Sequence, residues 1–250
     1  MSQSLDATPP AADTSPRRVQ RVRHELRRRA LVVRRAEQLS PGFVRITLGG
    51  DELQGFVSAS FDDHVKLLFD AGAARDYTPR HHDAAAGELQ IEFALHGDGP
   101  AAAWAAQART GDVLTVGGPR GSFIIPTDFD WHLLVGDDTA LPAIARRLEE
   151  LPAGSRAIVR LAVDAADRRT LASRADVDLQ WLDAADQLPQ AMRELALPAS
   201  EGYAWCAGEA AAMADVRRVL VQERGHPAHA IRAAAYWKRG TQAHHENLEA

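Results

Sequence analysis

The residues with the richest chemistry lie at positions 75–80, which read Arg-Asp-Tyr-Thr-Pro-Arg. The ring of Tyr77 offers an aromatic surface on which a planar cofactor such as an isoalloxazine ring can stack. The Thr78 hydroxyl could be a hydrogen-bond partner of the redox-active N5 atom of such a ring. The guanidinium groups of Arg75 and Arg80 can bind diphosphate oxygens in a bidentate manner. Taken alone, the six residues favour a plainer interpretation, an ordinary strand end with exposed arginines.

The position of Pro79 bears on whether these side chains could act together. Alternation along a regular strand would put Arg75 and Tyr77 on one face and Thr78 and Arg80 on the other. Proline occurs at strand edges, bulges and ends, where the alternation lapses. We therefore expect an irregular strand end at Pro79, which weakens this objection.

A second candidate segment for phosphate binding reads His96-Gly97-Asp98-Gly99-Pro100. Proline suits the first turn of a helix, because its missing N–H is not needed there. The unpaired N–H groups and the positive dipole end of such a helix favour a phosphate, and the glycines let an anion approach the backbone. The alternative is a Gly-Pro turn before a packing helix whose tryptophan, Trp104, belongs to the core.

These two segments resemble, in order and spacing, motifs of the siderophore-interacting protein family, the FAD-containing ferric-siderophore reductases. The resemblance extends from about Arg27 to Gly240 and includes four further segments, at residues 64–69, 117–123, 131–144 and 236–240. Each motif alone is weak, whereas the ordered set is specific.

The resemblance implies that FAD binds with Thr78 near N5, Tyr77 on the ring, and arginines and a helix start on the diphosphate. The cofactor-binding residues expected on this basis are Arg75, Tyr77, Thr78, Arg80, His96, Gly99, Pro100, Ala101, Ala102 and Trp104. Family members often carry a serine where Ala101 and Ala102 stand, so backbone donors would contribute more of the binding here. No protein acid or base is expected to act, because the flavin carries out the electron transfer.

Two domains are expected. Short, often alternating apolar segments between residues 30 and 116 predict an antiparallel barrel or sandwich, with one helix from Pro100 to about Arg109. From Trp131 onward, alternating strands and helices predict a parallel doubly wound α/β sheet. The resemblance implies a six-stranded Greek-key FAD-binding barrel followed by a nucleotide-binding α/β domain, the ferredoxin-reductase-like plan. We predict a disordered Arg-rich leader at residues 1–29, the barrel at 30–128, the α/β domain at 129–240 and a tail at 241–250.

Ligands of open α/β sheets bind beyond the carboxyl ends of the strands, and two predicted loops lie there. The residues expected to bind a nicotinamide dinucleotide in these loops are Asp137, Thr139, Ala140, Gly208 and Glu209. The first loop is not the G-x-G-x-x-G fingerprint, and its two aspartates oppose a phosphate, so a merely capped loop is the alternative. These residues do not distinguish NADH, NADPH or a ferredoxin as the electron donor.

Lys238 and Arg239 end the last predicted strand. A basic rim would attract an anionic ferric catecholate or hydroxamate, although terminal Lys-Arg pairs are usually just solvated. The resemblance makes both residues candidates for substrate binding, with Lys66 and Arg160 as weaker ones.

Composition limits the remaining classes. The chain has 250 residues, 46% hydrophobic and 25% charged, which is typical of a soluble globular protein. A net charge of −5 argues against general nucleic-acid binding; the arginines between residues 17 and 35 could form a nucleic-acid arm, but we prefer a solvated tail running into a first strand. No membrane span or signal peptide is apparent. The single cysteine, Cys206, excludes an intrachain disulfide and makes the cytosol the default compartment.

Ten histidines invite a metal-site interpretation. His81-His82-Asp83 and His244-His245-Glu246 lack the spacing of a catalytic zinc site, and a loop and a flexible tail are expected there instead. We expect no resident metal. Hydrolase and phosphotransferase classes fit poorly because no Gly-x-Ser-x-Gly elbow or P-loop is present.

The sequence therefore predicts a monomeric, cytosolic FAD-dependent reductase that releases iron as Fe(II) from imported ferric siderophores, with NADH or NADPH as donor. Reduction loosens the iron because hard oxygen ligands hold Fe(III) more strongly than Fe(II). One alternative is a general NAD(P)H:flavin or quinone oxidoreductase. The other is a non-catalytic siderophore-binding protein.

Overall fold

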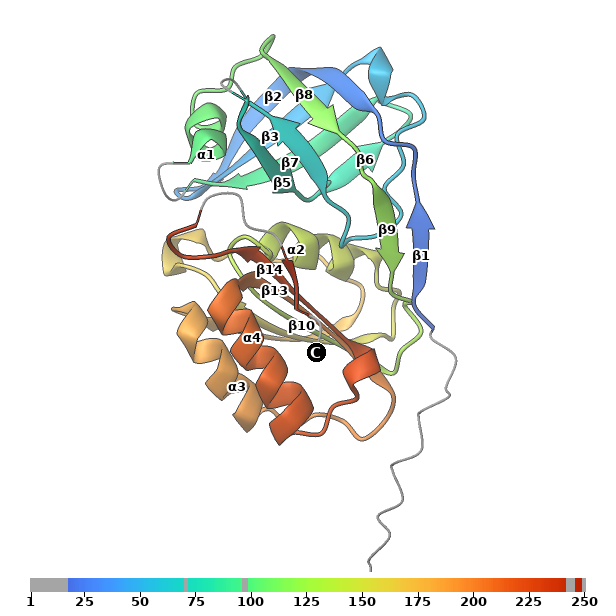
Figure 1. Ribbon diagram of the computed structural model, residues 1–250, viewed down its shortest axis with the longest axis vertical. Coiled ribbons are helices and arrows are strands. Elements are labelled where there is room, and N and C mark those ends of the chain that lie inside the picture. The colour runs from blue at the N-terminus through green and yellow to red at the C-terminus, as the bar shows by residue number, and fades with distance from the viewer. Residues whose placement is uncertain (1–17, 70–71, 96–98, 242–245, 249–250) are drawn as a thin grey trace, which may run out of the picture.

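The first half of the chain forms one antiparallel sheet of seven strands in the order β5–β4–β8–β2–β3–β7–β6. It is seen in a computed structural model that describes residues 18–69, 72–95, 99–241 and 246–248 (Figure 1). The strands are β2 (Arg28–Ser40), β3 (Phe43–Gly49), β4 (Val65–Leu68), β5 (Ala74–Tyr77), β6 (His81–Asp83), β7 (Glu88–Ala94) and β8 (Val113–Gly117).

The two edge strands of this sheet are consecutive in the chain, because only residues 78–80 separate β5 from β6. Neighbouring Cα atoms lie about 3.8 Å apart, so the two edges are at most about 15 Å apart and the sheet must curl into a barrel. The buried alternating positions fill its interior with apolar side chains, among them Leu31, Val33, Ile46, Leu48, Val65, Leu67, Leu89, Ile91, Phe93, Leu114 and Val116.

The resemblance implies six barrel strands, whereas the sheet has seven because the chain breaks its pairing at Pro79. Proline cannot donate a hydrogen bond to the ladder. Pairing resumes at once, since the Arg80 N–H donates to the Gln90 carbonyl at 2.9 Å. Residues 81–83 were predicted to be a loop and instead form β6, paired with β7.

The predicted leader is also too long. Residues 1–17 lie outside the described part, but β1 (Gln20–Arg23) is a regular strand that pairs with β9 (Gly121–Ile124). A Cβ at Gly121 would lie 2.4 Å from the Val22 carbonyl oxygen. Only glycine there lets β1 approach β9 this closely, a contact that an arginine-rich composition does not signal.

The second half forms a six-stranded sheet in the order β12–β11–β10–β13–β14–β15. Its strands are β10 (Trp131–Asp137), β11 (Arg156–Ala162), β12 (Asp176–Leu182), β13 (Gly202–Glu209), β14 (Ile231–Trp237) and β15 (Glu246–Asn247). The first five are parallel, as predicted, and β15 runs antiparallel to β14 within the segment predicted to be a tail.

Helices cover both faces of this sheet (Figure 1). Between the sheet and the barrel lies α2 (Leu141–Glu150), while α3 (Leu188–Glu194) and α4 (Ala210–Arg218) cover the far face, α4 continuing as a π-helix at Val219–Glu223. The barrel helix, α1 (Pro100–Ala105), ends earlier than predicted, because the Gln107 N–H bonds the Trp104 carbonyl in a tight turn. Short 3₁₀ turns lie at Asp51–Leu53, Ala165–Asp167, Ala185–Gln187 and Ala228–Ala230. Among the helices of the described ranges, none is long and apolar enough to cross a membrane.

The two domains share one apolar core. Phe43 and Phe61 of the barrel pack in a single cluster with Leu134, Ile144 and Trp205 of the α/β domain. Polar bonds reinforce it, since the Trp205 indole donates to the buried Asp62 carboxylate at 2.8 Å. This continuous packing holds the two domains together.

A buried histidine in β10 predicts acid sensitivity. His132 is 2% exposed, its Nε2 lies 3.3 Å from the Thr127 carbonyl oxygen, and Arg147 donates to its Nδ1 at 3.4 Å. Burial, and then the positive charge of Arg147, lower the pKa of His132 to about 4. The neutral ring therefore contributes full stability above pH 6.5, its unfolded value, and the contribution falls as the pH drops toward 4.

We expect this one group to cost up to about 3 kcal/mol of unfolding free energy between pH 6.5 and 4. His132→Gln should flatten the stability profile over that window. Urea unfolding at a series of pH values measures both slopes. Equal slopes in the two proteins would contradict the assignment.

Candidate flavin and donor site

The aromatic residue expected to stack on the flavin lies beside the helix expected to bind its diphosphate. The Tyr77 ring centroid is 4.5 Å from that of Phe93 in β7, and Trp104 of α1 lies 5.7 Å from the same Phe93 ring. Burial raises the pKa of Tyr77 to about 12. Two segments predicted separately from the sequence thus meet on one side of the barrel.

The start of α1 has the features of an anion-binding turn. Gly99 is its N-cap residue, no side chain among the described residues caps the first turn, and Pro100 stands at the beginning. Counting only the part of the chain that the structure describes, a Cβ at Gly99 would meet nothing within 4 Å. Ala101 is buried against the barrel core, and Ala102 is half-buried. The predicted contact His96 lies outside the described residues.

The side chains of Arg75 and Thr78 have different contacts within the protein. The half-buried Arg75 guanidinium donates to its neighbour's carbonyl, that of Ala74, at 2.8 Å. Thr78 is 7% exposed and hydrogen-bonds the Tyr236 phenol of β14 in the other domain. The residue predicted to lie near N5 is therefore also a contact between the domains.

Arg80 is used differently from the prediction. Its side chain is buried, and the guanidinium makes two bonds to Glu149 of α2, at 2.7 and 2.5 Å. Its Nε lies 3.4 Å from the buried Glu92 carboxylate. Because this guanidinium is committed to protein carboxylates, we do not retain Arg80 among the candidates for diphosphate binding.

The predicted donor loops meet at the point where the strand order reverses. In the sheet, β13 follows β10 directly although it is the fourth parallel strand in the chain, so their carboxyl ends form the switch point at which such folds bind ligands. The Asp137 carboxylate accepts from the Thr139 N–H at 3.0 Å, the Glu209 N–H at 2.8 Å and the Trp237 indole at 2.8 Å. Gly208 is required beside it, since a Cβ there would lie 2.6 Å from the Asp137 Oδ2.

Asp137 and Ala140 thus hold the loop together and offer no surface to a ligand. Burial, and then the charge of Asp138, raise the pKa of Asp137 to about 6. Ala140 is fully buried. Glu209 caps α4 through bonds to its first amides, so its carboxylate also serves the fold. The sequence analysis left open a capped loop that binds no ligand. That alternative fits much of the sheet edge formed by the carboxyl ends of β10 and β13.

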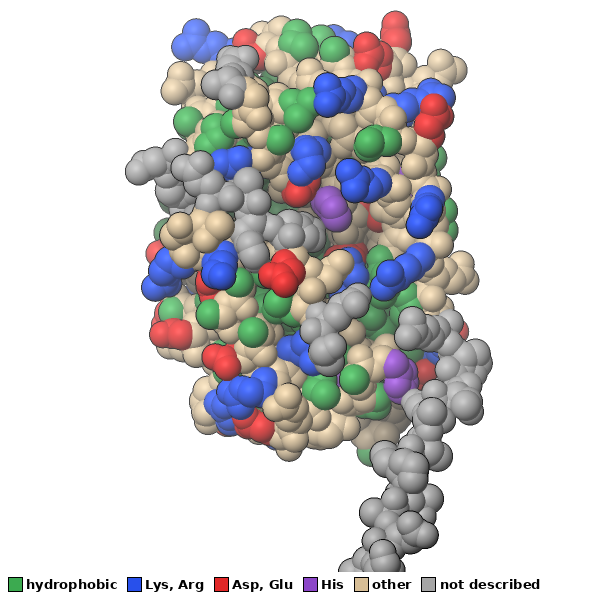
Figure 2. Space-filling view, viewed as in Figure 1, with side chains coloured by type: hydrophobic (Ala, Val, Ile, Leu, Met, Phe, Trp, Pro, Cys, Tyr) green, Lys and Arg blue, Asp and Glu red, His purple; other side chains and the backbone are tan. Residues whose placement is uncertain are grey.

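The candidates for substrate binding are accessible. Lys238 and Arg239 are exposed in the turn that follows β14, and the Arg239 N–H lies 3.4 Å from Glu209. Figure 2 shows Lys and Arg side chains on the drawn face of both domains. Positive side chains of this kind attract anions.

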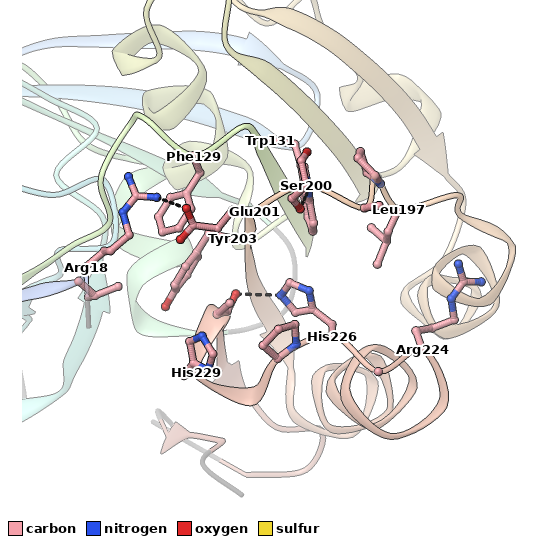
Figure 3. Close-up of a pocket in the computed structure, with 17 residues that line it drawn as sticks. Arg18, Phe129, Trp131, Leu197, Ser200, Glu201, Tyr203, Arg224, His226 and His229 are labelled. Carbon is pink, nitrogen blue, oxygen red and sulfur yellow. Dashed lines mark hydrogen bonds and ion pairs between the residues drawn. The ribbon is translucent and has the colours of Figure 1, made fainter. Parts of the chain in front are cut away.

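A separate pocket of about 450 Å³ lies at the other end of the α/β sheet (Figure 3). Trp131 and Gly202, which begin β10 and β13, line it, as do Arg18 and Glu201, which form an ion pair. Because it faces the amino ends of the strands, it does not belong to the candidate site.

His81 and His82, the adjacent histidines considered for metal binding, have different surroundings in β6. His81 is exposed, whereas the His82 ring packs edge-on against Phe56 at 4.9 Å. In the described part of the chain, no three His, Cys, Asp or Glu side chains gather in a way that could hold a metal ion. His244 and His245 lie outside that part.

Both domains match models of known protein families. Residues 32–74 and 70–123 match the model described as "Siderophore-interacting FAD-binding domain", and residues 129–240 match "Siderophore-interacting protein". The chain belongs to the siderophore-interacting protein family. The family resemblance drawn from the sequence motifs is thereby confirmed.

Named members of the siderophore-interacting protein family align along most of the chain. The "NADPH-dependent ferric-chelate reductase" of Escherichia coli K12 is 38% identical, covering 90% of this chain and 98% of the relative. The "Ferric vibriobactin reductase ViuB" of Vibrio cholerae is 32% identical, covering 85% and 90%. The crystal structure of a siderophore utilization protein from T. fusca superposes with a TM-score of 0.84 at 35% identity, covering 90% of this chain and 98% of that one.

Sequence reasoning missed two residues that organise this site. Tyr236 lay in a recognised motif but was given no role, because its bond to Thr78 joins residues far apart in the chain. Glu92 stands between the core residues Ile91 and Phe93, so alternation assigns it to solvent. Arg45 lies opposite Glu92 on the neighbouring strand β3, and its positive charge was the one clue in the sequence to an ion pair. Nothing in the sequence indicated that Glu92 is buried.

Proposed function

We propose that this protein is an FAD-dependent ferric-siderophore reductase of the cytosol that uses NADPH or NADH. The observation that carries the proposal is the match of the barrel to a siderophore-interacting FAD-binding domain, on which Tyr77 and the start of α1 lie together. The names of the two relatives, a ferric-chelate reductase and a ferric vibriobactin reductase, support the same reaction. The barrel itself corresponds to a six-stranded Greek-key plan if β5 and β6 are one strand interrupted at Pro79.

The residues present fit FAD. Bound FAD would supply the electron transfer between a two-electron hydride donor and a one-electron metal acceptor. Tyr77 would stack on the ring, Thr78 would face its N5 edge, and Arg75 with the first amides of α1 would hold the diphosphate. The described residues near these positions need supply no acid or base, so their contribution is placement.

The donor and the acceptor are proposed to approach from the α/β domain. The nicotinamide dinucleotide would lie at the carboxyl ends of β10 and β13, along Thr139 and Gly208. The ferric chelate would lie near Lys238 and Arg239, whose charges raise the local concentration of an anion. Each hydride carries two electrons, so one NAD(P)H should reduce two Fe(III) ions.

An anaerobic absorption spectrum of the purified protein tests the proposal. We expect a flavin spectrum that bleaches with NADPH or NADH and recovers on addition of a ferric siderophore, with two Fe(II) captured per NAD(P)H by a ferrous chelator. Equal turnover with quinones and free flavin would favour a general oxidoreductase. Absence of flavin after incubation with FAD would overturn the reductase and leave a siderophore-binding protein.

A further inference from the structure

The three-residue turn that closes the barrel is held by side chains of the α/β domain. Arg146 of α2 donates to the Pro79 carbonyl at 2.8 Å. Glu149, one helical turn further on, binds the Arg80 guanidinium, and Tyr236 of β14 hydrogen-bonds Thr78. Every residue of the turn thus has a partner in the other domain.

The same helix links this turn to the donor loop. The chain passes directly from Asp137 and its hydrogen-bonded loop into α2. Leu141, Ile144 and Leu148 are fully buried in the core shared by the two domains. Their packing fixes α2 against the sheet. A displacement of the donor loop therefore has to move Arg146 and Glu149 with it.

We propose that these contacts of Arg146, Glu149 and Tyr236 with residues 78–80, the seam clamp, set the distance between the flavin-binding face of the barrel and the donor site. The inference rests on the proposed function and names residues that position its two ligands. Hydride transfer requires the reacting atoms about 3–3.5 Å apart, so small displacements slow it strongly. The clamp holds Thr78 itself, the residue nearest the proposed point of transfer.

The chemistry of the clamp favours precision of position. Arg80 is buried and meets Glu149 through two guanidinium nitrogens, an arrangement that defines both distance and direction. Arg146 also donates to the Ser58 hydroxyl at 2.8 Å and the Ser58 carbonyl at 3.0 Å, which ties α2 to a second barrel loop. The Glu149 side chain is 40% exposed, so its charge can be removed without opening a cavity.

The test uses Glu149→Gln and Arg146→Gln in the full chain. Glu223→Gln is the matched control, because Glu223 forms a similar pair with Arg193 at 2.8 Å entirely within the α/β domain. Spin labels at introduced cysteines, Ala106→Cys on the barrel and Ala196→Cys on the α/β domain, report the distance between the domains. The native Cys206 is fully buried and does not compete for the label.

We expect both clamp variants to broaden the distance distribution and to slow flavin reduction by NADPH at least tenfold. Their FAD affinity and the reoxidation of dithionite-reduced flavin by a ferric chelate should stay within twofold of wild type, as should every property of Glu223→Gln. An unchanged distribution with an unchanged reduction rate would overturn the clamp. A loss of FAD affinity at an unchanged distance would also overturn it, since the residues would then support the cofactor site locally.

Failure of the proposed function gives a different result. If NADPH and NADH leave the wild-type flavin oxidised, the reductase proposal fails, while the spin-label distances still test the clamp. If wild type is reduced and the variants match it in rate and distance, the clamp alone fails.

Discussion

Replacing Glu92 with alanine is expected to lower the free energy of unfolding by about 3–5 kcal/mol, the cost of breaking a buried ion pair from one side. Glu92 is 2% exposed and accepts from Arg45 at 2.6 Å. It also pairs with Arg80 and with Arg169, which comes from the α/β domain. Without the carboxylate, the partly buried guanidinium groups of Arg45 and Arg169 lose this counter-charge, while Arg80 still pairs with Glu149.

Urea unfolding measures this loss. Trp104 is the tryptophan of the barrel, and Trp131, Trp181, Trp205 and Trp237 belong to the α/β domain, so fluorescence and circular dichroism together follow both domains. Glu223→Ala provides the surface control and should change stability by less than about 1 kcal/mol. Glu92→Ala with stability equal to that control would contradict the importance of the buried network.

Replacing Tyr77 with alanine is expected to weaken FAD binding at least about tenfold, since stacking of a flat ring system on an aromatic side chain contributes roughly 1–3 kcal/mol. The ring already packs on Phe93, so it presents a preformed surface. Tyr77→Phe is the matched control. Because stacking uses the face of the ring and not the hydroxyl, the phenyl ring should preserve binding within about twofold.

Titration of flavin-free protein with FAD, followed by flavin fluorescence, gives both affinities. Thermal unfolding of the unliganded variants separates lost stacking from lost packing, because Tyr77→Ala also removes a contact to Phe93. If Tyr77→Ala binds FAD as tightly as wild type does, the flavin ring lies elsewhere on the barrel.

Much of the fold could be predicted from local patterns. Alternation marked the barrel strands, and buried apolar runs followed by helical spacing marked β10 and α2. Gly99 and Pro100 marked the start of α1, because their backbone preferences act within a few residues. The strand β1 could not be predicted this way, since its arginines and exposed side chains carry no core signal and its pairing depends on Gly121.

The sequence by itself determined the two-domain plan, the family and the segments that meet at the candidate site. These follow from periodicity and from the order of motifs, which need no knowledge of distant contacts. The tertiary structure alone decided what the charged residues do. Arg80, Glu92 and Asp137 occupy positions that read as solvent-facing or ligand-facing, yet each is buried. The reason is physical: whether a charge meets water, a ligand or a counter-charge depends on what covers it, and here the cover comes from the other domain or from a strand distant in the chain.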